Sequence, residues 1–243
     1  MGSKGSSRHM KRNAAPAFWR IPRKEGRFVV KPSPGPHPIS RSYPLSTLLR
    51  DVLKNVKTMR EARSLIVSGK ILVDGVVRRE PKFAVGLMDA IQFPSMGTAY
   101  RLLPSSKVML YPIKVDIESI STKLCKVKSK HKIRSGFFSY GLHDGRTIVS
   151  KEDLGLSSHD SVILKVPKQE IVSKAKFEKG SLALLLKGKS AGKIGLIKDI
   201  VNGSFSSEKS ANVEVDGSII NVPARLLIVV GVDKPLIAMD GVS

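Results

Sequence analysis

The sequence contains a single cysteine and no long apolar run. Cys125 alone cannot form a disulfide framework within the chain, and it cannot supply a cysteine-based zinc site. This composition is typical of a reducing, intracellular compartment. No apolar stretch approaches the ~20 residues that a membrane-spanning helix needs, and no signal peptide is recognised. We therefore expect neither a disulfide-rich secreted protein nor a membrane protein.

Acidic and aromatic residues are scarce. Twenty Asp and Glu face 42 Lys and Arg, which gives a formal charge of +22 over 243 residues. A chain with that much self-repulsion is best explained by a polyanionic partner. Nucleic acid is the first candidate, because each neutralised phosphate releases a counterion. Aromatic residues make up only 5% of the chain, which argues against base stacking and for recognition of phosphates and shape.

Composition and periodicity divide the chain into five segments, and together they predict an α+β, multi-domain protein. The predicted segments are a basic N-terminal extension at 1–44, a small helix–helix–strand domain at 45–104, a central β-rich, barrel-like domain at 105–173, a second β-rich module at 174–232 and a tail at 233–243.

The N-terminal extension combines basic side chains with closely spaced prolines. Ten Lys or Arg face one acid, Glu25, and four prolines between 32 and 38 prevent regular helix or strand pairing. A basic arm of this kind is expected to order only on RNA. Phe18, Trp19 and Ile21 nevertheless predict that part of it docks on a protein surface. The candidate RNA contacts in the arm are Arg8, His9, Lys11, Arg12, Arg20 and Lys24.

The region after the arm predicts two helices followed by a strand. Apolar residues over 45–56 follow the i, i+3, i+4 spacing of an amphipathic helix. Thr58, with Glu61 three residues later, is typical of a capping box, so a second helix begins there and ends at Gly69. A strand and the Asp74–Gly75 hairpin turn follow.

Basic side chains surround these helices and the turn after them. The candidate RNA contacts here are Arg50, Lys54, Lys57, Arg60, Arg63 and Lys70. Backbone N–H groups at the helix N-termini would add donors for phosphate. The charges by themselves favour the alternative of a solvated helix face, so the interpretation depends on the surrounding motif.

The stretch from Thr58 to Gly75 resembles the RNA-binding domain named after bacterial small-subunit protein S4. The matching residues are Thr58, Ala62, Arg63, Leu65, Ile66, Gly69, Ile71, Val73, Asp74 and Gly75. Two positions depart from the usual pattern: Met59 and Pro44 stand where arginine is common. The domain occurs in proteins of several functions, so this resemblance implies binding to structured RNA and no more.

A second motif lies at 176–200. Its glycines allow tight turns and close approach between strands; they are Gly180, Gly188, Gly192 and Gly195. The segment resembles the KOW motif of ribosomal proteins and elongation factors, which implies a small five-stranded barrel. Lys187, Lys189 and Lys193 decorate the loop expected to meet RNA. The alternative is a small barrel with basic loops and no RNA role. A nucleotide-binding loop at 188–190 is disfavoured because Ala183 stands where that loop requires glycine.

A third motif is a run of basic residues between 123 and 134, uninterrupted by acid. Five of these residues have even numbers and would point to one face of a strand, forming a row that faces phosphates. The five are Lys126, Lys128, Lys130, Lys132 and Arg134. A solvated charge run explains the pattern equally well.

Residues that could carry catalysis are dispersed. Five histidines show no metal-binding spacing, and no pair of carboxylates has a catalytic pattern. His143 and Asp144 are adjacent at a predicted turn, where capping of the local backbone is the commoner role, and no nucleophile is tied to them. We expect no enzymatic activity, no metal and no cofactor.

The order of arm, RNA domain, β module and KOW module resembles the archaeal and eukaryotic small-subunit ribosomal protein family S4e. The resemblance covers about residues 2–235. Further matching stretches are Gly5, Arg8–Arg12, Ala15–Pro16, Trp19, Pro32–His37, Val85–Asp89, Leu124–Lys126 and Leu142–Arg146. The last of these adds Arg146 to the candidate RNA contacts. Phe138–Tyr140 departs from the family's pattern.

This resemblance implies a structural constituent of the small ribosomal subunit without enzymatic activity. It would bind small-subunit rRNA mainly through backbone phosphates, contact neighbouring ribosomal proteins and act as a monomer within cytoplasmic ribosomes. The lack of a long C-terminal extension favours an archaeal source. Two alternatives stay open: an RNA-modifying enzyme that uses the helix–helix–strand unit at 45–93 for targeting, and a transcription elongation accessory factor built on the KOW module.

Overall fold

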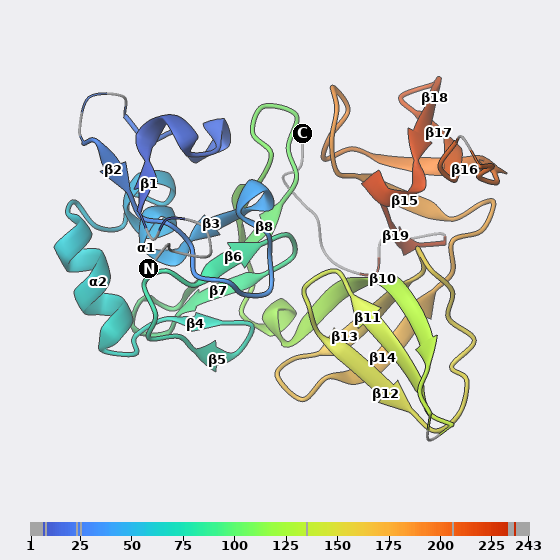
Figure 1. Ribbon diagram of the computed structural model, residues 1–243, viewed down its shortest axis with the longest axis horizontal. Helices are drawn as coiled ribbons and strands as arrows, with labels where there is room; N and C mark the ends of the chain where they lie inside the picture. The colour runs from blue at the N-terminus through green and yellow to red at the C-terminus, as the bar shows by residue number, and fades with distance from the viewer. Residues whose placement is uncertain are drawn as a thin grey trace, which may run out of the picture.

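The computed structural model describes residues 7, 9–22, 24, 26–134, 136–205, 207–232 and 236. Three five-stranded antiparallel sheets follow one another along the chain (Figure 1). Helices are few and short, so the α+β expectation is confirmed as a mostly-sheet fold. None of the helices among these residues combines the length and apolar character that crossing a membrane requires.

The N-terminal arm packs on the first domain. Its elements are β1 (Met10–Lys11), η1 (Arg12–Ala14), η2 (Ala17–Trp19), β2 (Phe28–Val29) and η3 (Ile39–Arg41), with β1 paired to β2. Trp19 is fully buried, and its indole N–H donates to the carbonyl of Ser42 at 2.8 Å. The predicted docking is therefore confirmed. The expectation that the arm orders only on RNA is corrected, because its apolar side chains have a protein core to pack against.

The helices of the first domain are shorter than the periodicity predicts. They are α1 (Leu45–Thr47), the π-helical turn η4 (Leu48–Val52) and α2 (Met59–Val67). The predicted helix over 45–56 stops early because Lys54 adopts a left-handed conformation with φ of 55°. The capping box is confirmed. Thr58 Oγ1 accepts the N–H of Glu61 at 3.2 Å, and the Glu61 carboxylate accepts the N–H of Thr58 at 3.3 Å.

The first sheet has the order β5-β4-β7-β8-β9. These strands are β4 (Leu72–Val73), β5 (Val76–Val77), β7 (Ala90–Phe93), β8 (Thr98–Leu103) and β9 (Tyr111–Val115), with η5 (Pro94–Met96) between β7 and β8. Beside the sheet, β3 (Ser42–Pro44) pairs with β6 (Ala84–Gly86). The predicted boundary at 104 falls inside this sheet, because β9 pairs with β8 along its whole length. Periodicity identifies strands but does not identify their partners.

The central sheet has the order β12-β11-β10-β13-β14. Its elements are η6 (Glu118–Ser121), β10 (Thr122–Lys132), β11 (Phe138–Leu142), β12 (Thr147–Ser150), β13 (Ser161–Lys165) and β14 (Glu170–Ala175). The first half of β10 pairs with β13 and the second half with β11. A register shift between Val127 and Ser129 interrupts the alternation of its side chains.

The C-terminal sheet has the order β18-β17-β16-β15-β19. Its elements are β15 (Leu182–Leu185), β16 (Ile194–Val201), β17 (Ser210–Val215), β18 (Ser218–Pro223), η7 (Ala224–Leu226) and β19 (Leu227–Gly231). The predicted tail at 233–243 lies outside the described residues, except for Leu236.

One apolar cluster joins the three sheets. Met88 and Leu103 from the first domain pack with Leu124 and Ile163 of the central sheet and with the C-terminal sheet through Leu184, Ile228 and Val230. All seven side chains are buried. The three modules therefore share a core in addition to the cores of their own.

Candidate nucleic-acid interface

The helix α2 carries an exposed basic surface. Arg60 and Arg63 lie one turn apart, so they share a face, and both are exposed. Lys57 before the helix and Lys70 after it are exposed as well. Figure 1 shows α2 at one end of the long axis of the molecule, where a large polyanion can approach it. Four of the six cations expected in this domain are therefore exposed on α2 or next to its ends.

The other two expected cations of this domain lie before the helix. Lys54 is exposed. Arg50 is partly buried, and its guanidinium contacts the carboxylate of Asp51 at 2.9 Å. Arg50 therefore brings less free charge to the surface than Lys54 does.

The N-terminus of α2 offers fewer amide donors for phosphate than expected. The Glu61 carboxylate accepts the N–H groups of Thr58 and Lys57, at 3.3 and 3.0 Å, and these bonds lower the pKa of Glu61. Thr58 Oγ1 takes the N–H of Glu61 itself. The capping box therefore satisfies these three donors internally and places a negative charge there, and a phosphate contact at this helix end stays a prediction.

The expected cations of the arm divide into two groups. His9, Lys11, Arg20 and Lys24 are exposed. Arg12 is half-buried, and its guanidinium donates to the carbonyl of Ile21, which closes the arm on itself. Arg8 lies outside the described residues.

The predicted row along β10 is broken. Lys128, Lys132 and Arg134 are exposed, but Lys126 is only 5% exposed. Its ammonium donates to the carbonyls of Ala224 and Leu227 at 2.6 and 2.7 Å. The expected exposed position of Lys126 is therefore wrong. The bulge after Val127 breaks the two-residue alternation on which that expectation depended.

Two further expected cations carry exposed ion pairs. Lys130 contacts Asp153 at 2.6 Å, and this hydrogen bond lowers the pKa of Asp153 to about 2. In the C-terminal module Lys187, Lys189 and Lys193 are all exposed, and Lys193 pairs with Asp216. Exposed pairs of this kind contribute little to stability, so they leave both lysines free to exchange their partner for phosphate.

A buried ionic cluster joins the first domain to the central sheet. The ammonium of Lys123 lies 2.7 Å from Asp74, 2.5 Å from Asp89 and 3.1 Å from Asp144. Burial acts against the charged ammonium, but Asp89 and Asp74 outweigh it and raise the pKa of Lys123. His37 of the arm contacts Asp89 at 3.1 Å, so three parts of the chain meet in this cluster.

Arg146 belongs to this cluster. Its guanidinium lies 2.8 Å from Asp74 and 3.4 Å from Asp144, and its side chain is 18% exposed. The charge of Arg146 is therefore paired within the protein, and its expected contact with RNA stays a prediction. The sequence did not indicate this arrangement. Asp74 and Asp144 both precede glycine in a turn motif, and a turn by itself accounts for an aspartate at that position.

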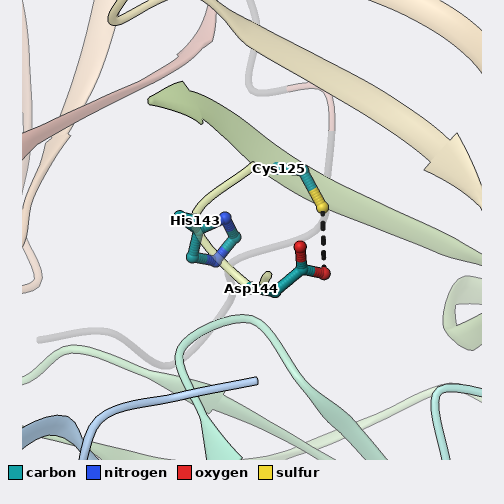
Figure 2. Close-up of side chains that lie close together, drawn as sticks. All are labelled: Cys125, His143 and Asp144. Atoms are coloured by element: carbon teal, nitrogen blue, oxygen red, sulfur yellow. Dashed lines mark hydrogen bonds between the residues drawn. The ribbon is translucent and has the colours of Figure 1, made fainter. Parts of the chain in front are cut away.

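Cys125, His143 and Asp144 lie close together in the interior (Figure 2), with one ligand-type atom of each within 4.8 Å of the others. Both ring nitrogens of His143 are engaged, however. Nδ1 accepts the N–H of Lys126, and Nε2 therefore carries the proton that it donates to the carbonyl of Leu87, each at 3.2 Å. No imidazole lone pair is free for a metal.

The other two groups are occupied as well. Burial raises the pKa of the Cys125 thiol well above its usual value, so the thiol stays protonated and donates to Asp144 at 3.6 Å. The same carboxylate oxygen already faces the ammonium of Lys123. This trio is a hydrogen-bonded part of the ionic cluster, with the chemistry of charge pairing and not of metal binding or nucleophilic attack.

Family models match most of the chain. Residues 4–40 match the RS4NT domain, residues 44–91 the S4 domain and residues 96–171 the ribosomal family S4e. The relatives named small ribosomal subunit protein eS4 include one from Ignicoccus hospitalis, 38% identical over 97% of this chain and 96% of its own length. Another, from Methanothermobacter thermautotrophicus, is 39% identical over 99% of both chains.

A solved structure resembles this fold. It is the crystal structure of the 30S ribosomal protein S4e from Thermoplasma acidophilum, with a TM-score of 0.69 and 28% identity. The similarity covers 79% of this chain and 96% of that one.

Proposed function

This chain belongs to the ribosomal S4e family, and on that premise we propose that it is a structural component of the small ribosomal subunit that holds rRNA mainly through contacts to backbone phosphates. The observation that carries the mechanism is the spread of exposed cations over the arm, α2, β10 and the loop before β16, in a chain of formal charge +22. Contacts to phosphate position a protein on RNA without reading its sequence.

The parts of the chain would contribute in different ways. The S4 domain supplies the rigid basic surface at α2. The C-terminal sheet is a KOW-type module whose exposed lysines face RNA. The partners are small-subunit rRNA and neighbouring ribosomal proteins, and the place of action is the cytoplasmic ribosome of an archaeal cell, as a monomer in each subunit.

Salt dependence of binding to a small-subunit rRNA fragment tests this mechanism. Affinity should fall steeply with salt, because every neutralised phosphate releases counterions. The triple variant Arg60→Glu, Arg63→Glu and Lys70→Glu should bind at least roughly tenfold more weakly and with a smaller slope. A matched control with the same change in charge is Lys151→Glu, Lys165→Glu and Lys168→Glu, which are exposed residues outside the proposed interface.

The two triple variants separate local contact from overall charge. Equal weakening in both would remove α2 from the interface, and a flat salt slope for the unchanged protein would overturn the phosphate mechanism.

We infer no catalytic role, and the alternatives of an RNA-modifying enzyme or an elongation accessory factor are not favoured by membership of a ribosomal family. Sedimentation of cell extract provides the direct comparison. The chain should migrate with small subunits; migration with RNA polymerase instead would favour the accessory factor.

A further inference from the structure

A small cavity lies where the modules meet, next to the apolar cluster that joins the three sheets. Its volume is about 180 Å³, which is several times the roughly 30 Å³ that one water molecule occupies in the liquid. Arg41 of the arm, Lys126 and Lys128 of β10, and Arg225 of η7 all line it. The cavity is therefore bordered by cations from three separate parts of the chain.

The lining of this cavity is strongly unbalanced in charge. Four basic side chains line it, and no carboxylate does among the residues the structure describes. One of the four, Arg225, pairs with Glu208 at 3.1 Å, and His37, which also lines the cavity, contacts Asp89 at 3.1 Å. Arg41, Lys126 and Lys128 have no carboxylate partner among the described residues, so these three leave an excess of positive charge at the cavity.

Lys126 is the buried member of this group of cations, so water does not solvate its charge fully. Two of its three N–H donors bond to backbone carbonyls, and the third has no acceptor among the described residues. Burial, followed by the charges of Arg41 and Lys128, lowers the pKa of Lys126 to about 7. His159, which also lines the cavity, has a pKa lowered to about 4, by burial first and by Lys126 second.

We propose that this cavity is a binding site for one phosphate group, held by Arg41, Lys126 and Lys128. A guanidinium with two ammonium groups suits a compact oxyanion, because Arg offers a planar pair of donors and each Lys a point charge. The bound anion would take the free donor of Lys126 and clamp the arm to the central sheet. The phosphate could be a group of the RNA backbone or a free phosphate ion. Only the first of these sources rests on the proposed rRNA-binding function.

Thermal unfolding of the full chain in inorganic phosphate, against sodium chloride at matched ionic strength, tests the site without RNA. Phosphate should raise the unfolding midpoint saturably. Arg41→Gln and Lys128→Gln should each weaken the apparent phosphate affinity roughly tenfold or more, the scale of one hydrogen bond to a charged group. Both residues are exposed, so these variants should fold. Lys151→Gln and Lys168→Gln, exposed residues outside the proposed interface, are the controls and should respond as the unchanged protein does.

The comparison with the control variants decides the proposal, since general salt effects act on all variants alike. An equal response to phosphate in cavity and control variants would overturn it.

Where the cavity variants lose the response, the salt dependence of binding to the rRNA fragment identifies the source of the phosphate. A slope lower by about one in the Arg41→Gln and Lys128→Gln double variant assigns an RNA phosphate, and an unchanged slope assigns a free ion. A flat slope in the unchanged protein contradicts the proposed function and leaves the phosphate result standing.

Discussion

At the scale of single residues, Lys123 shows how charge fixes the first domain against the central sheet. Its side chain is only 2% exposed, and its ammonium contacts Asp74 and Asp89 from one module and Asp144 from its own. A buried charge whose partners are removed is strongly destabilising, whereas a fully paired one is tolerated. The cluster therefore favours one relative position of the two modules.

Replacing Lys123 should reveal this dependence. Lys123→Met leaves three buried carboxylates without their shared cation, and we expect the free energy of unfolding in urea to fall by about 3–5 kcal/mol. Lys130→Met, on the same strand, removes an exposed ion pair with Asp153 and should change little. Similar losses in the two variants would contradict the role of burial.

The lowered pKa of His143 predicts that the protein loses stability as the pH falls. Burial, with Lys123 next, lowers its pKa to about 4, whereas the unfolded imidazole titrates near ~6.5. Between these values the unfolded state binds more protons, so stability falls as the pH drops from about 6.5 to about 4. The loss should reach up to about 3 kcal/mol.

Unfolding in urea at several pH values measures this effect. His143→Gln keeps a donor and an acceptor but cannot take up the proton, so its stability should vary less over that range. His131→Gln, at an exposed position, should follow the unchanged protein. A pH profile that His143→Gln leaves unaltered would assign the acid dependence to other groups.

The sequence correctly predicts a residue of the candidate interface only where a basic side chain is also exposed in the fold. Arg60 and Arg63 are exposed as expected, because they stand opposite the buried Ala62 and Ile66 stripe of a correctly predicted helix. Lys126 and Arg146 could not be placed, because their partners are carbonyls and carboxylates distant in the sequence. Local pattern carries no information about such partners.

At the scale of elements, close strand pairing in the C-terminal sheet depends on Gly195. A Cβ at this position would lie 2.5 Å from Val213 Cγ1 and 2.6 Å from the carbonyl oxygen of Glu214, which belongs to the backbone of the neighbouring strand. Two strands could not keep this separation around a side chain. The sequence-based expectation of close approach at Gly195 is therefore confirmed.

Gly195→Ala should separate β16 from β17 and lower the free energy of unfolding by about 1–3 kcal/mol, the range for overpacked cores. Gly35→Ala is a suitable control, because the nearest atom to its added Cβ is 3.8 Å away. Thermal or urea denaturation measures both. A Gly195→Ala variant as stable as the Gly35→Ala variant would mean that the strands shift apart without loss.

Elements with a strong local signal were predictable, and those set by distant contacts were not. The start of α2 and the hairpin turn at Asp74–Gly75 follow from capping and turn chemistry within a few residues. The early end of the first helix and the place of β9 in the first sheet were missed. Both depend on backbone geometry and pairing that the two-residue and 3.6-residue periods do not encode.

At the scale of the whole molecule, the shared apolar cluster couples modules that each have a core of their own. Ile228 on β19 is 1% exposed and packs in the cluster that contains Met88 of the first domain and Leu124 of the central sheet. Trp19, the single tryptophan, reports on the first domain, where it is buried. Fluorescence and far-ultraviolet circular dichroism therefore follow different parts of the same unfolding reaction.

This arrangement makes cooperativity testable. In the unchanged protein the two urea transitions should coincide, because unfolding any one module exposes the cluster that all three share. Ile228→Ala removes about 2–5 kcal/mol of packing at that cluster, so the C-terminal sheet should unfold first and the dichroism transition should precede the fluorescence transition. Ile219→Ala on β18, which is 67% exposed, should stay within about 0.5 kcal/mol and keep the transitions together. If Ile228→Ala behaves as Ile219→Ala does, the apolar junction contributes nothing to the coupling of the three modules, and the hydrogen bonds of Lys126 to Ala224 and Leu227 remain to hold the C-terminal sheet on the central one.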